Sequence, residues 1–522
     1  MDIFSEIISL IKSGKIRNAE QLHRIKIKLS AKYHLNKIPS NSEILENAAP
    51  EDVDAVREFL KIKPVRTISG VAVVAIMTAP APCPHGKCIY CPGGVEFHTP
   101  QSYTGKEPAA MRALQNKFDP YTQTLARIQQ LEQIGHNTDK IDLIVMGGTF
   151  TSMPPDYQRN FIKGAFDAMN SEISQTLEEA HLRNEVAAHR CIGLTIETRP
   201  DCFRIEDADR ILGFGATRVE LGVQIIDDDV LEFVKRAHRV SETVVATRIA
   251  KDAGLKVGYH IMPGLPLSNP EKDIRLFKKL FENPEFRPDM LKIYPCLVLE
   301  NTDLYSLWEK GRYRPYNTEE AAEVIARMKE NVPRYVRIQR IQRDIPAYLI
   351  VDGVKKSNLR EIVLKKMSVE GKKCNCIRCR EIGHNMLKKN VNVENYALNV
   401  LEYNASEGHE YFISIDTEND YLIGYARLRI PSEKKWRREL KEGAGIIREL
   451  KVFGQVVCVG AEAKTRFQQQ HRGFGKRLLD AAEEILRNKG LKKILVTSGV
   501  GAREYYRKYG FERDGAYMGK NL

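Results

Sequence analysis

Three cysteines lie close together near residue 90. The stretch Cys83–Gly94, CPHGKCIYCPGG, contains Cys83, Cys88 and Cys91, with four residues in the first gap and two in the second. So dense a group of thiols in a chain without secretory features indicates a metal centre rather than a disulfide. Three thiolates cannot close a tetrahedral zinc site alone, but they can bind three irons of a four-iron cluster and leave the fourth iron open to a further ligand. The alternative is a zinc knuckle with three cysteines.

A second group of thiols follows much later in the chain. Cys374, Cys376 and Cys379 fit a closed structural zinc site that needs one more ligand. The two candidates are His384, five residues beyond Cys379, and the distant Cys296. Local spacing favours His384. A redox-sensitive surface trio is the alternative, and it is disfavoured because thiols packed so closely would oxidise.

A glycine-rich loop lies near residue 473. The stretch Gln470–Gly475 opens a helix whose apolar residues recur with a helical period. Unpaired backbone N–H groups at such a helix start form a receptor for pyrophosphate. The loop follows a predicted antiparallel hairpin, Glu410–Ile415 with Tyr421–Ile430, and a strand at Ile446–Val452, and it precedes a strand at Lys493–Thr497. A Rossmann dinucleotide site is the alternative, and the hairpin order argues against it.

The cysteine loop and several polar residues each follow a predicted strand. Between about residues 68 and 345, runs rich in apolar and β-branched residues alternate with helical stretches, which implies parallel βα units in a barrel of six strands rather than eight. Active sites of parallel barrels lie at the carboxyl ends of the strands. The six predicted strands are Gly70–Met77, Ile141–Met146, Ile192–Glu197, Arg218–Val223, Lys256–Ile261 and Met290–Tyr294.

The residues at these strand ends are candidates for ligand binding. Gly147 and Gly148 follow the second strand, where glycines let the backbone approach a ligand closely. Glu197 and Arg199 end the third strand and place a carboxylate and a guanidinium at the mouth of the barrel. A structural ion pair is the alternative, but for Glu197 the position favours a functional role.

The charge of the chain favours a polyanionic partner. The net charge is +13 and the pI is about 9.1. Eight lysines and arginines between Lys12 and Lys37 face one acid, Glu20, which suggests a phosphate-contacting surface, although a solvated helix face explains the pattern equally well. Arg334–Arg343 carries four arginines three apart. In a strand, this spacing sends successive arginines to opposite faces, so only some of them could contact phosphates together. The alternative is an exposed edge strand that carries charge.

Six of the ten cysteines belong to the two tight groups, which fits a reducing cytoplasm. The amino terminus has no signal-peptide pattern, and no apolar run approaches the ~20 residues of a membrane helix. We therefore expect a cytoplasmic protein without a membrane partner.

The cysteine loop, together with Pro92–Gly94 and Gln101–Gly105, resembles the cluster loop of radical S-adenosylmethionine (SAM) enzymes. Nearly end to end, the chain resembles the catalytic subunit of the Elongator complex and its single-chain relatives, which modify the wobble uridine of tRNA. The commonest radical-SAM spacing has three residues in the first gap, whereas this chain has four. The resemblance implies an α/β fold with a partial (β/α)6 radical-SAM barrel, a GNAT-fold acetyltransferase domain and a small basic helical amino-terminal region.

The resemblance also implies a division into domains. We expect a basic helical tRNA-binding region at 1–66, the radical-SAM partial barrel at 67–350, a zinc-binding linker at 351–390 and the GNAT domain at 391–522.

The resemblance implies four cofactors or cosubstrates and assigns residues to them. The [4Fe-4S] cluster takes Cys83, Cys88 and Cys91. Zinc takes Cys374, Cys376 and Cys379, with Cys296 preferred over His384 as the fourth ligand. SAM takes Gly147, Gly148, Glu197 and Arg199. Acetyl-CoA takes Lys140, expected near the radical site, and Glu449, Leu450, Lys451, Val452, Gln470, Gly473, Phe474, Gly475, Lys476 and Tyr506. The residues assigned to catalysis are Lys140, Glu197 and Tyr506, the last as an acid.

A radical generator and an acetyl-CoA site on one chain suggest a tRNA carboxymethyluridine synthase of acyltransferase type. In this hypothesis a radical derived from SAM removes hydrogen from the acetyl methyl group, and the carbon radical adds to C5 of the wobble uridine; oxidation and thioester hydrolysis leave 5-carboxymethyluridine. The partner would be the anticodon stem-loop of tRNA with its wobble base unstacked. The sequence leaves a homodimer open.

The rivals are a protein lysine acetyltransferase with a structural iron–sulfur cluster and an RNA-binding scaffold with degenerate sites. A radical methylthiolation enzyme would leave the carboxy-terminal module unexplained.

Overall fold

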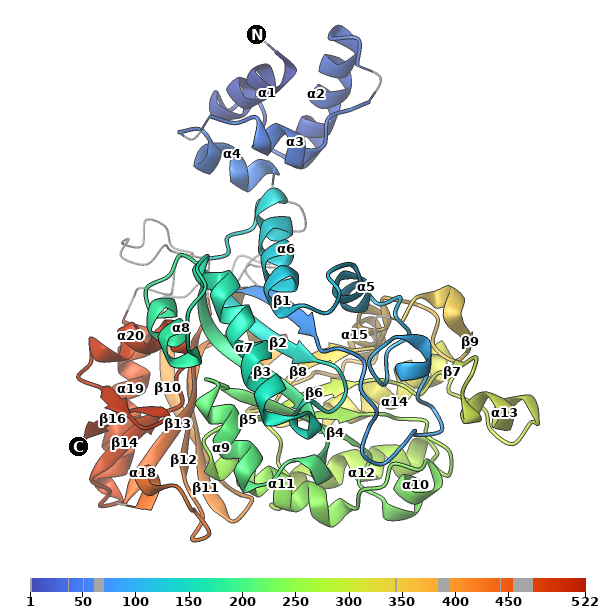
Figure 1. Ribbon diagram of the computed structural model, residues 1–522, viewed down its shortest axis with the longest axis vertical. Coiled ribbons are helices and arrows are strands. Elements are labelled where there is room, and N and C mark those ends of the chain that lie inside the picture. The colour runs from blue at the N-terminus through green and yellow to red at the C-terminus, as the bar shows by residue number, and fades with distance from the viewer. Residues whose placement is uncertain are drawn as a thin grey trace.

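The computed structural model describes residues 2–35, 37–49, 51–60, 70–342, 345–383, 395–441, 443–453 and 473–522. Figure 1 shows a small helical group at the amino terminus, a central α/β body and a second sheet formed by the carboxy-terminal quarter of the chain. Gln470 and His384, both named above as candidate ligands, lie outside the described residues.

The amino-terminal helices form a small unit with its own apolar core. Ile7, Ile16, Ile44 and Val56 are fully buried within it. In Figure 1 the unit stands apart from most of the body and lies next to α6, which α3 contacts. Its helices are α1 (Ile3–Lys12), α2 (Ala19–Lys32), α3 (Asn41–Glu46) and α4 (Val53–Leu60).

The central sheet contains the six predicted strands and one more. Its strands pair in the order β1-β2-β3-β4-β5-β6-β8, and every neighbouring pair is parallel. The seventh strand is the arginine-rich segment, which lies at the edge of the sheet. The strands are β1 (Ala72–Met77), β2 (Lys140–Met146), β3 (Arg190–Thr198), β4 (Arg218–Gln224), β5 (Lys256–Ile261), β6 (Met290–Ile293) and β8 (Arg337–Ile341).

Helices cover the outer face of this curled sheet (Figure 1). Ile141, Leu143 and Val145 alternate along β2 and are fully buried, as expected of side chains on the helix-covered face. The helices are α5 (Pro108–Gln115), α6 (Pro120–Gln133), α7 (Pro155–Asn170), α8 (Leu177–Asn184), α9 (Ile205–Gly213), α10 (Asp228–Phe233), α11 (Val240–Asp252), α12 (Pro270–Glu282), α13 (Asp303–Glu309), α14 (Thr318–Glu330), α15 (Leu359–Val369) and α16 (Ile377–Arg380). Two short strands, β7 (Val298–Leu299) and β9 (Ile350–Asp352), form a separate antiparallel pair.

The carboxy-terminal sheet is mixed. Its strands pair in the order β10-β11-β12-β13-β14-β16-β15, and only β13 and β14 are parallel. The predicted hairpin corresponds to β11 and β12, whereas β10 was not predicted. The elements are β10 (Tyr396–Ala405), β11 (Gly408–Thr417), β12 (Leu422–Ile430), α18 (Arg438–Lys441), β13 (Ala444–Val452), α19 (Phe474–Asn488), β14 (Lys493–Val496), α20 (Arg503–Arg507), β15 (Glu512–Asp514) and β16 (Tyr517–Asn521).

A buried network of charges joins the two sheets. Arg448 of β13 donates to both carboxylate oxygens of Asp289, at 2.6 and 2.7 Å, and to Glu410 of β11 at 2.7 Å. Arg429 of β12 reaches Glu410 at 2.9 Å and Asp252 of α11 at 2.6 Å. All five side chains are fully buried. The central barrel and the carboxy-terminal sheet therefore form one packed body.

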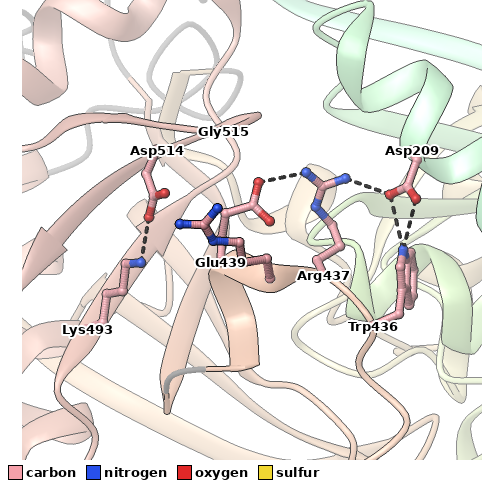
Figure 2. Close-up of a pocket in the computed structure, with 8 residues that line it drawn as sticks. Asp209, Trp436, Arg437, Glu439, Lys493, Asp514 and Gly515 are labelled. Carbon is pink, nitrogen blue, oxygen red and sulfur yellow. Dashed lines mark hydrogen bonds and ion pairs between the residues drawn. The ribbon is translucent and has the colours of Figure 1, made fainter.

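A polar cavity of about 590 Å³ lies at the same interface (Figure 2). Asp209 of α9 accepts hydrogen bonds from Trp436 Nε1 at 3.1 Å and from Arg437 at 2.6 Å. Lys493 pairs with Asp514 at 2.7 Å. Five of the charged residues that line this cavity, Asp209, Arg437, Glu439, Lys493 and Asp514, are thus paired with one another, and the cavity lies between α9 and the second sheet. No helix in the described part of the chain is long and apolar enough to cross a membrane.

Candidate functional site

The cysteine loop lies at the carboxyl end of the barrel strands. It leaves β1, and the thiols of Cys83 and Cys91 line a cavity of about 140 Å³. Cys83 Sγ lies 3.6 Å from Thr149 Oγ1, and Cys91 Sγ accepts a hydrogen bond from Gln101 Nε2 at 3.2 Å.

Two buried guanidinium groups lie behind the thiols. Arg236 Nη1 is 3.7 Å from Cys88 Sγ, and Arg199 donates to the backbone oxygen of Arg236 at 2.9 Å. Burial raises the pKa of the Cys83 thiol, and the two arginines oppose that rise. Thiolates are the ligands that an iron–sulfur cluster requires, and the nearby positive charges stabilise them. The residues present therefore fit a [4Fe-4S] cluster.

Two glycines follow β2, and Gly148 lines the cavity. Gly147 has φ 137°, and a Cβ there would overlap Thr78 Oγ1. Gly148 has φ 92° and lines the cavity. Both values lie in the region that favours glycine. The two glycines let the backbone pack closely against Thr78 and Gln101, and their assignment to SAM stays a prediction.

Two buried carboxylates share one lysine at the bottom of the cavity. Lys292 Nζ donates to Glu197 Oε1 at 2.9 Å and also pairs with Glu220. Glu197 Oε2 accepts from the Tyr103 hydroxyl at 3.1 Å, and His260 Nε2 lies 2.9 Å from Glu220. Burial alone would raise the pKa of Glu220, but Lys292 and His260 hold it well below its usual value. Glu197 thus lies at the cavity as predicted, and it is ionically paired there.

Arg199 does not line this cavity. Its guanidinium donates to both oxygens of Asp201 at 2.9 Å and contacts His85 of the cysteine loop. Arg199 therefore forms the structural ion pair that was the alternative to a functional role. Its partner is Asp201, and its guanidinium is directed toward the cysteine loop rather than the cavity. Its position suits stabilisation of the thiolates instead of contact with SAM.

Lys140 lies far from the cysteines, which corrects the expectation that it is near the radical site. It is the first residue of β2, whereas Gly147 follows the other end of the same strand. Six residues of extended chain span about 20 Å. Lys140 pairs in register with Arg190, whose side chain packs against Gly501 of the second sheet domain. A contact with acetyl-CoA from this position remains a prediction.

The second thiol group is compact, and Cys296 is not part of it. The sulfurs of Cys374, Cys376 and Cys379 lie within 4.8 Å of one another, and Lys329 Nζ donates to Cys374 at 3.2 Å. These thiols are joined to the amino end of β8, since Ile377 N donates to Val336 O.

The predicted fourth ligand, Cys296, follows the carboxyl end of β6. Because β6 and β8 are parallel, Cys296 lies at the opposite end of the strands from the three thiols. The three thiols suit zinc, and the choice of Cys296 as fourth ligand was wrong for this geometry.

In the carboxy-terminal sheet, β13 pairs with β14 over only part of its length. The parallel pairing of β13 with β14 ends at Ile447 and Val496, so along this edge the remainder of β13, which holds Glu449–Val452, has no paired strand among the residues that the structure describes. Burial and the neighbouring Arg337 together lower the pKa of Lys451 to about 8. Burial raises the pKa of Tyr506, as does Glu449. A phenol with a raised pKa stays protonated at neutral pH, and the role of Tyr506 as an acid stays a prediction.

The glycine-rich loop leads into α19, a helix of 15 residues. Gly473 caps this helix with φ 76°. Phe474 is buried and packs against Tyr396, and Lys476 is exposed and pairs with Asp480 at 2.7 Å. The helix start therefore presents backbone N–H groups as predicted, while the Phe474 side chain belongs to the core.

Replacing Gly475 with alanine should weaken this site. A Cβ at position 475 would overlap the Tyr505 hydroxyl, and such overpacking costs about 1–3 kcal/mol. We expect a lower melting temperature and weaker acetyl-CoA binding by calorimetry for G475A. Adding Tyr505→Phe removes the overlapping oxygen, so the double variant G475A/Y505F should recover most of both losses. Equal losses in the single and double variants would contradict this reading.

Several residues of the site were not assigned from the sequence. Tyr103, Glu220, Arg236 and Lys292 all line the cavity or contact residues that do. The signal for Glu220 and Lys292 is their place on the inward-facing side of β4 and β6. Arg236 follows α10 in a loop and carried no such signal.

A thiol loop at the carboxyl end of a parallel half-barrel, joined to a sheet that opens beside a glycine-rich helix start, defines a radical-SAM protein fused to a GNAT module. Comparisons agree, and the matched regions are the ELP3 N-terminal domain at 1–68, the Radical SAM superfamily at 81–280, the Radical SAM C-terminal domain at 288–368 and the acetyltransferase (GNAT) family at 381–511. A radical-SAM domain implies a [4Fe-4S] cluster and SAM, and a GNAT domain implies acetyl-CoA.

The chain belongs to the Elongator complex protein 3 family. It is 52% identical to the tRNA uridine(34) acetyltransferase of Methanocaldococcus jannaschii over 528 residues, which cover all of this chain and 97% of that protein. It is 43% identical to human Elongator complex protein 3 over 531 residues, covering all of this chain and 96% of that protein. The solved structure of Methanocaldococcus infernus Elp3, lacking residues 1–46, matches 87% of this chain and all of that chain with 49% identity and a TM-score of 0.78.

Proposed function

We propose that this protein modifies the wobble uridine of tRNA by attaching a carboxymethyl group, derived from acetyl-CoA, to C5. The observation that carries the proposal is the presence of two candidate sites in one packed body. The thiol loop and its cavity lie at one end of the barrel, and the open edge of β13 lies at the other. The relatives are named for uridine 34 of tRNA and for the Elongator complex.

The reaction explains why both sites are needed. Uridine C5 is a poor nucleophile, so a simple acetyl transfer would not form the new carbon–carbon bond. The cluster and SAM, when bound, supply the radical chemistry that activates a methyl carbon. Cys83, Cys88 and Cys91 would hold the cluster, and Arg199 and Arg236 would stabilise their thiolates.

The protein's own groups then place and protect the reactants. Glu197, held by Lys292 and Tyr103, would orient a hydroxyl-bearing cosubstrate, since a buried carboxylate accepts hydrogen bonds strongly. Tyr506 would return a proton to the sulfur of CoA. The Cys374 group, with zinc bound, would stiffen the segment that follows α15.

The basic amino-terminal unit supports tRNA as the partner. In α2, Arg24 and Lys28 are exposed, and the helix belongs to a unit that stands apart from most of the body (Figure 1). Exposed lysines and arginines neutralise phosphates without reading sequence. Such a unit can hold the folded RNA while one base enters the barrel cavity.

The test is anaerobic incubation of the reconstituted protein with tRNA, dithionite, SAM and methyl-labelled acetyl-CoA, followed by mass spectrometry of the nucleosides. Label in a carboxymethylated uridine supports the proposal. Absence of label from uridine contradicts it. Label on lysines that needs neither SAM nor Cys88 would favour a protein lysine acetyltransferase.

A further inference from the structure

The inward-facing side of the barrel sheet is charged. Parallel barrels ordinarily fill this space with branched apolar side chains. Here the register aligns Arg218 with Lys256, Glu197 with Glu220, and His260 with Lys292 and then Arg340. Residues aligned in this way share one face of a sheet. The inner charged strip consists of Lys140, Asp142, Glu197, Arg218, Glu220, Lys256, His260, Lys292 and Arg340.

Close contacts connect the strip along the length of the barrel. Lys292 lies 2.9 Å from Glu197 and pairs with Glu220. Glu220 Oε1 is 3.3 Å from Arg218 Nε, and Arg218 Nη2 is 3.4 Å from Asp142 Oδ2. Glu197 and Lys292 line the cavity at the cysteine loop. Asp142 and Arg218 belong to the amino-terminal halves of their strands, so the contacts span the barrel.

The far end of the strip meets the GNAT module. The backbone oxygen of Leu255, the residue before Lys256, accepts a hydrogen bond from Arg448 of β13 at 2.9 Å, and Arg427 donates to Glu449 of β13 at 2.9 Å. Burial alone would raise the pKa of Glu449, but Lys256 and Arg427 lower it to about 2. The same glutamate is close enough to raise the pKa of Tyr506. The strip therefore begins beside the open edge of β13 and ends at the radical-site cavity.

Polar atoms without partners lie along this route. The Thr195 hydroxyl is fully buried next to Arg218 in the register, and the described residues give it no hydrogen-bond partner. Buried hydroxyls are nearly always satisfied, so this one indicates water or a polar ligand in the barrel. Gly193 and Gly258 lie on the same face, and the side chains of Asp142 and Glu220 lie against them, since a Cβ would be 3.2 Å from Asp142 Oδ1 and 3.1 Å from Glu220 Cγ.

Resting on the proposed function, we propose that the inner charged strip conducts an acetate-sized carboxylate from the GNAT module to the radical-site cavity. The acetate would arise by hydrolysis: a water oxygen bonds to the thioester carbon, the carbon–sulfur bond breaks, the thiol of CoA leaves with one proton, and a second proton goes to solvent. No electron is gained or lost in this step. The acyl group thus leaves CoA before its methyl carbon reacts.

The charges of the strip favour passage of a small anion over passage of an uncharged pantetheine arm or of a proton. The strip holds five lysines and arginines against three carboxylates. An incoming carboxylate can replace Asp142 or Glu220 as the partner of Arg218, whereas an uncharged pantetheine arm would break buried ion pairs without replacing them. Arginine does not give up its proton in proteins, so a chain of groups through Arg218 is a poor proton wire.

The test supplies the reconstituted full chain, tRNA, SAM and dithionite with either methyl-¹³C acetyl-CoA or methyl-¹³C acetate. We expect the wild type to label uridine from both sources. In Gly258→Val the new side chain would meet Glu220 Cγ, since even a Cβ would lie 3.1 Å from it. Labelling from acetyl-CoA should then fall at least about tenfold, because the space is filled, while labelling from acetate and hydrolysis of acetyl-CoA persist.

Thr195→Val provides a second variant of nearly unchanged volume that removes only the unpartnered hydroxyl. It should slow labelling from acetyl-CoA several-fold and leave labelling from acetate intact. A wild type that uses acetyl-CoA but never acetate would overturn the conduction proposal and leave the proposed function standing. Folded variants that label from acetyl-CoA at the wild-type rate would overturn it as well. Absence of label from both sources in the wild type would overturn the proposed function itself.

Discussion

Cys88→Ala should abolish formation of the modified uridine while acetyl-CoA still binds. Without this thiolate the loop keeps two ligands, and a four-iron cluster with an open corner needs three. We expect loss of bound iron and of the visible absorption of the cluster, and a fall in product of at least about 1,000-fold, because the cofactor supplies the difficult step. Iron analysis, absorption spectroscopy and nucleoside mass spectrometry measure these effects.

Cys202→Ala is the matched control. Cys202 lies just beyond β3 and is not one of the loop cysteines. Its backbone oxygen, which accepts a hydrogen bond from Thr151, is unaffected by the substitution. This variant should retain iron and activity. If Cys88→Ala kept wild-type product yield, or if Cys202→Ala lost its iron, the assignment of the cluster to the loop would be wrong.

Arg448→Met should strongly destabilise the joined domains. The substitution removes the nearest shared partner of the buried carboxylates Asp289 and Glu410 and leaves them only the more distant shared charge of Lys251, at 3.8 and 3.6 Å. Breaking a buried ion pair in this way costs about 3–5 kcal/mol. The exposed pair Lys434 and Glu407 gives the comparison, since Lys434→Met should cost about 0–1 kcal/mol. Urea unfolding at pH 7 measures both variants, and similar midpoints would contradict the role given to the network.

The same network predicts how the stability difference between the wild type and Arg448→Met depends on pH. Burial would raise the pKa of Asp289, but Arg448 and Lys251 hold it well below its usual value. A carboxyl group with a lowered pKa adds stability that is present above its unfolded pKa of about 4 and is lost as the pH falls toward the folded value. The gap between wild type and Arg448→Met should therefore be widest near neutral pH and narrow below about pH 4. A gap that widens in acid would contradict this explanation.

Much of the fold could be predicted from the sequence, because its buried strands occur there as short runs of apolar residues. The six apolar runs between residues 70 and 294 correspond to strands of the central sheet. Tyr396–Ala405 was not predicted, since it is an edge strand with mostly exposed side chains and so lacks an alternating apolar pattern. The arginine-rich strand β8 was ambiguous for a related reason, because charge alone does not fix the face to which a side chain points.

The site was predictable where residues are neighbours in the sequence and not where only the fold joins them. The cysteine spacing indicated the cluster, and the glycines after β2 indicated close backbone approach. The position of Cys296 relative to Cys379 depends on the end of the parallel strands at which each cysteine lies. Local spacing in the sequence does not reveal this. The inner charged strip did leave a signal, because charged residues alternate in segments such as Arg218–Glu220.

The most direct test uses acetyl-CoA whose methyl group carries three deuterons, with SAM, tRNA and dithionite under anaerobic conditions. The account predicts a carboxymethylated uridine that keeps two deuterons, with the third recovered in 5′-deoxyadenosine. A uridine without deuterium, or deuterium confined to acetylated lysines, would contradict it.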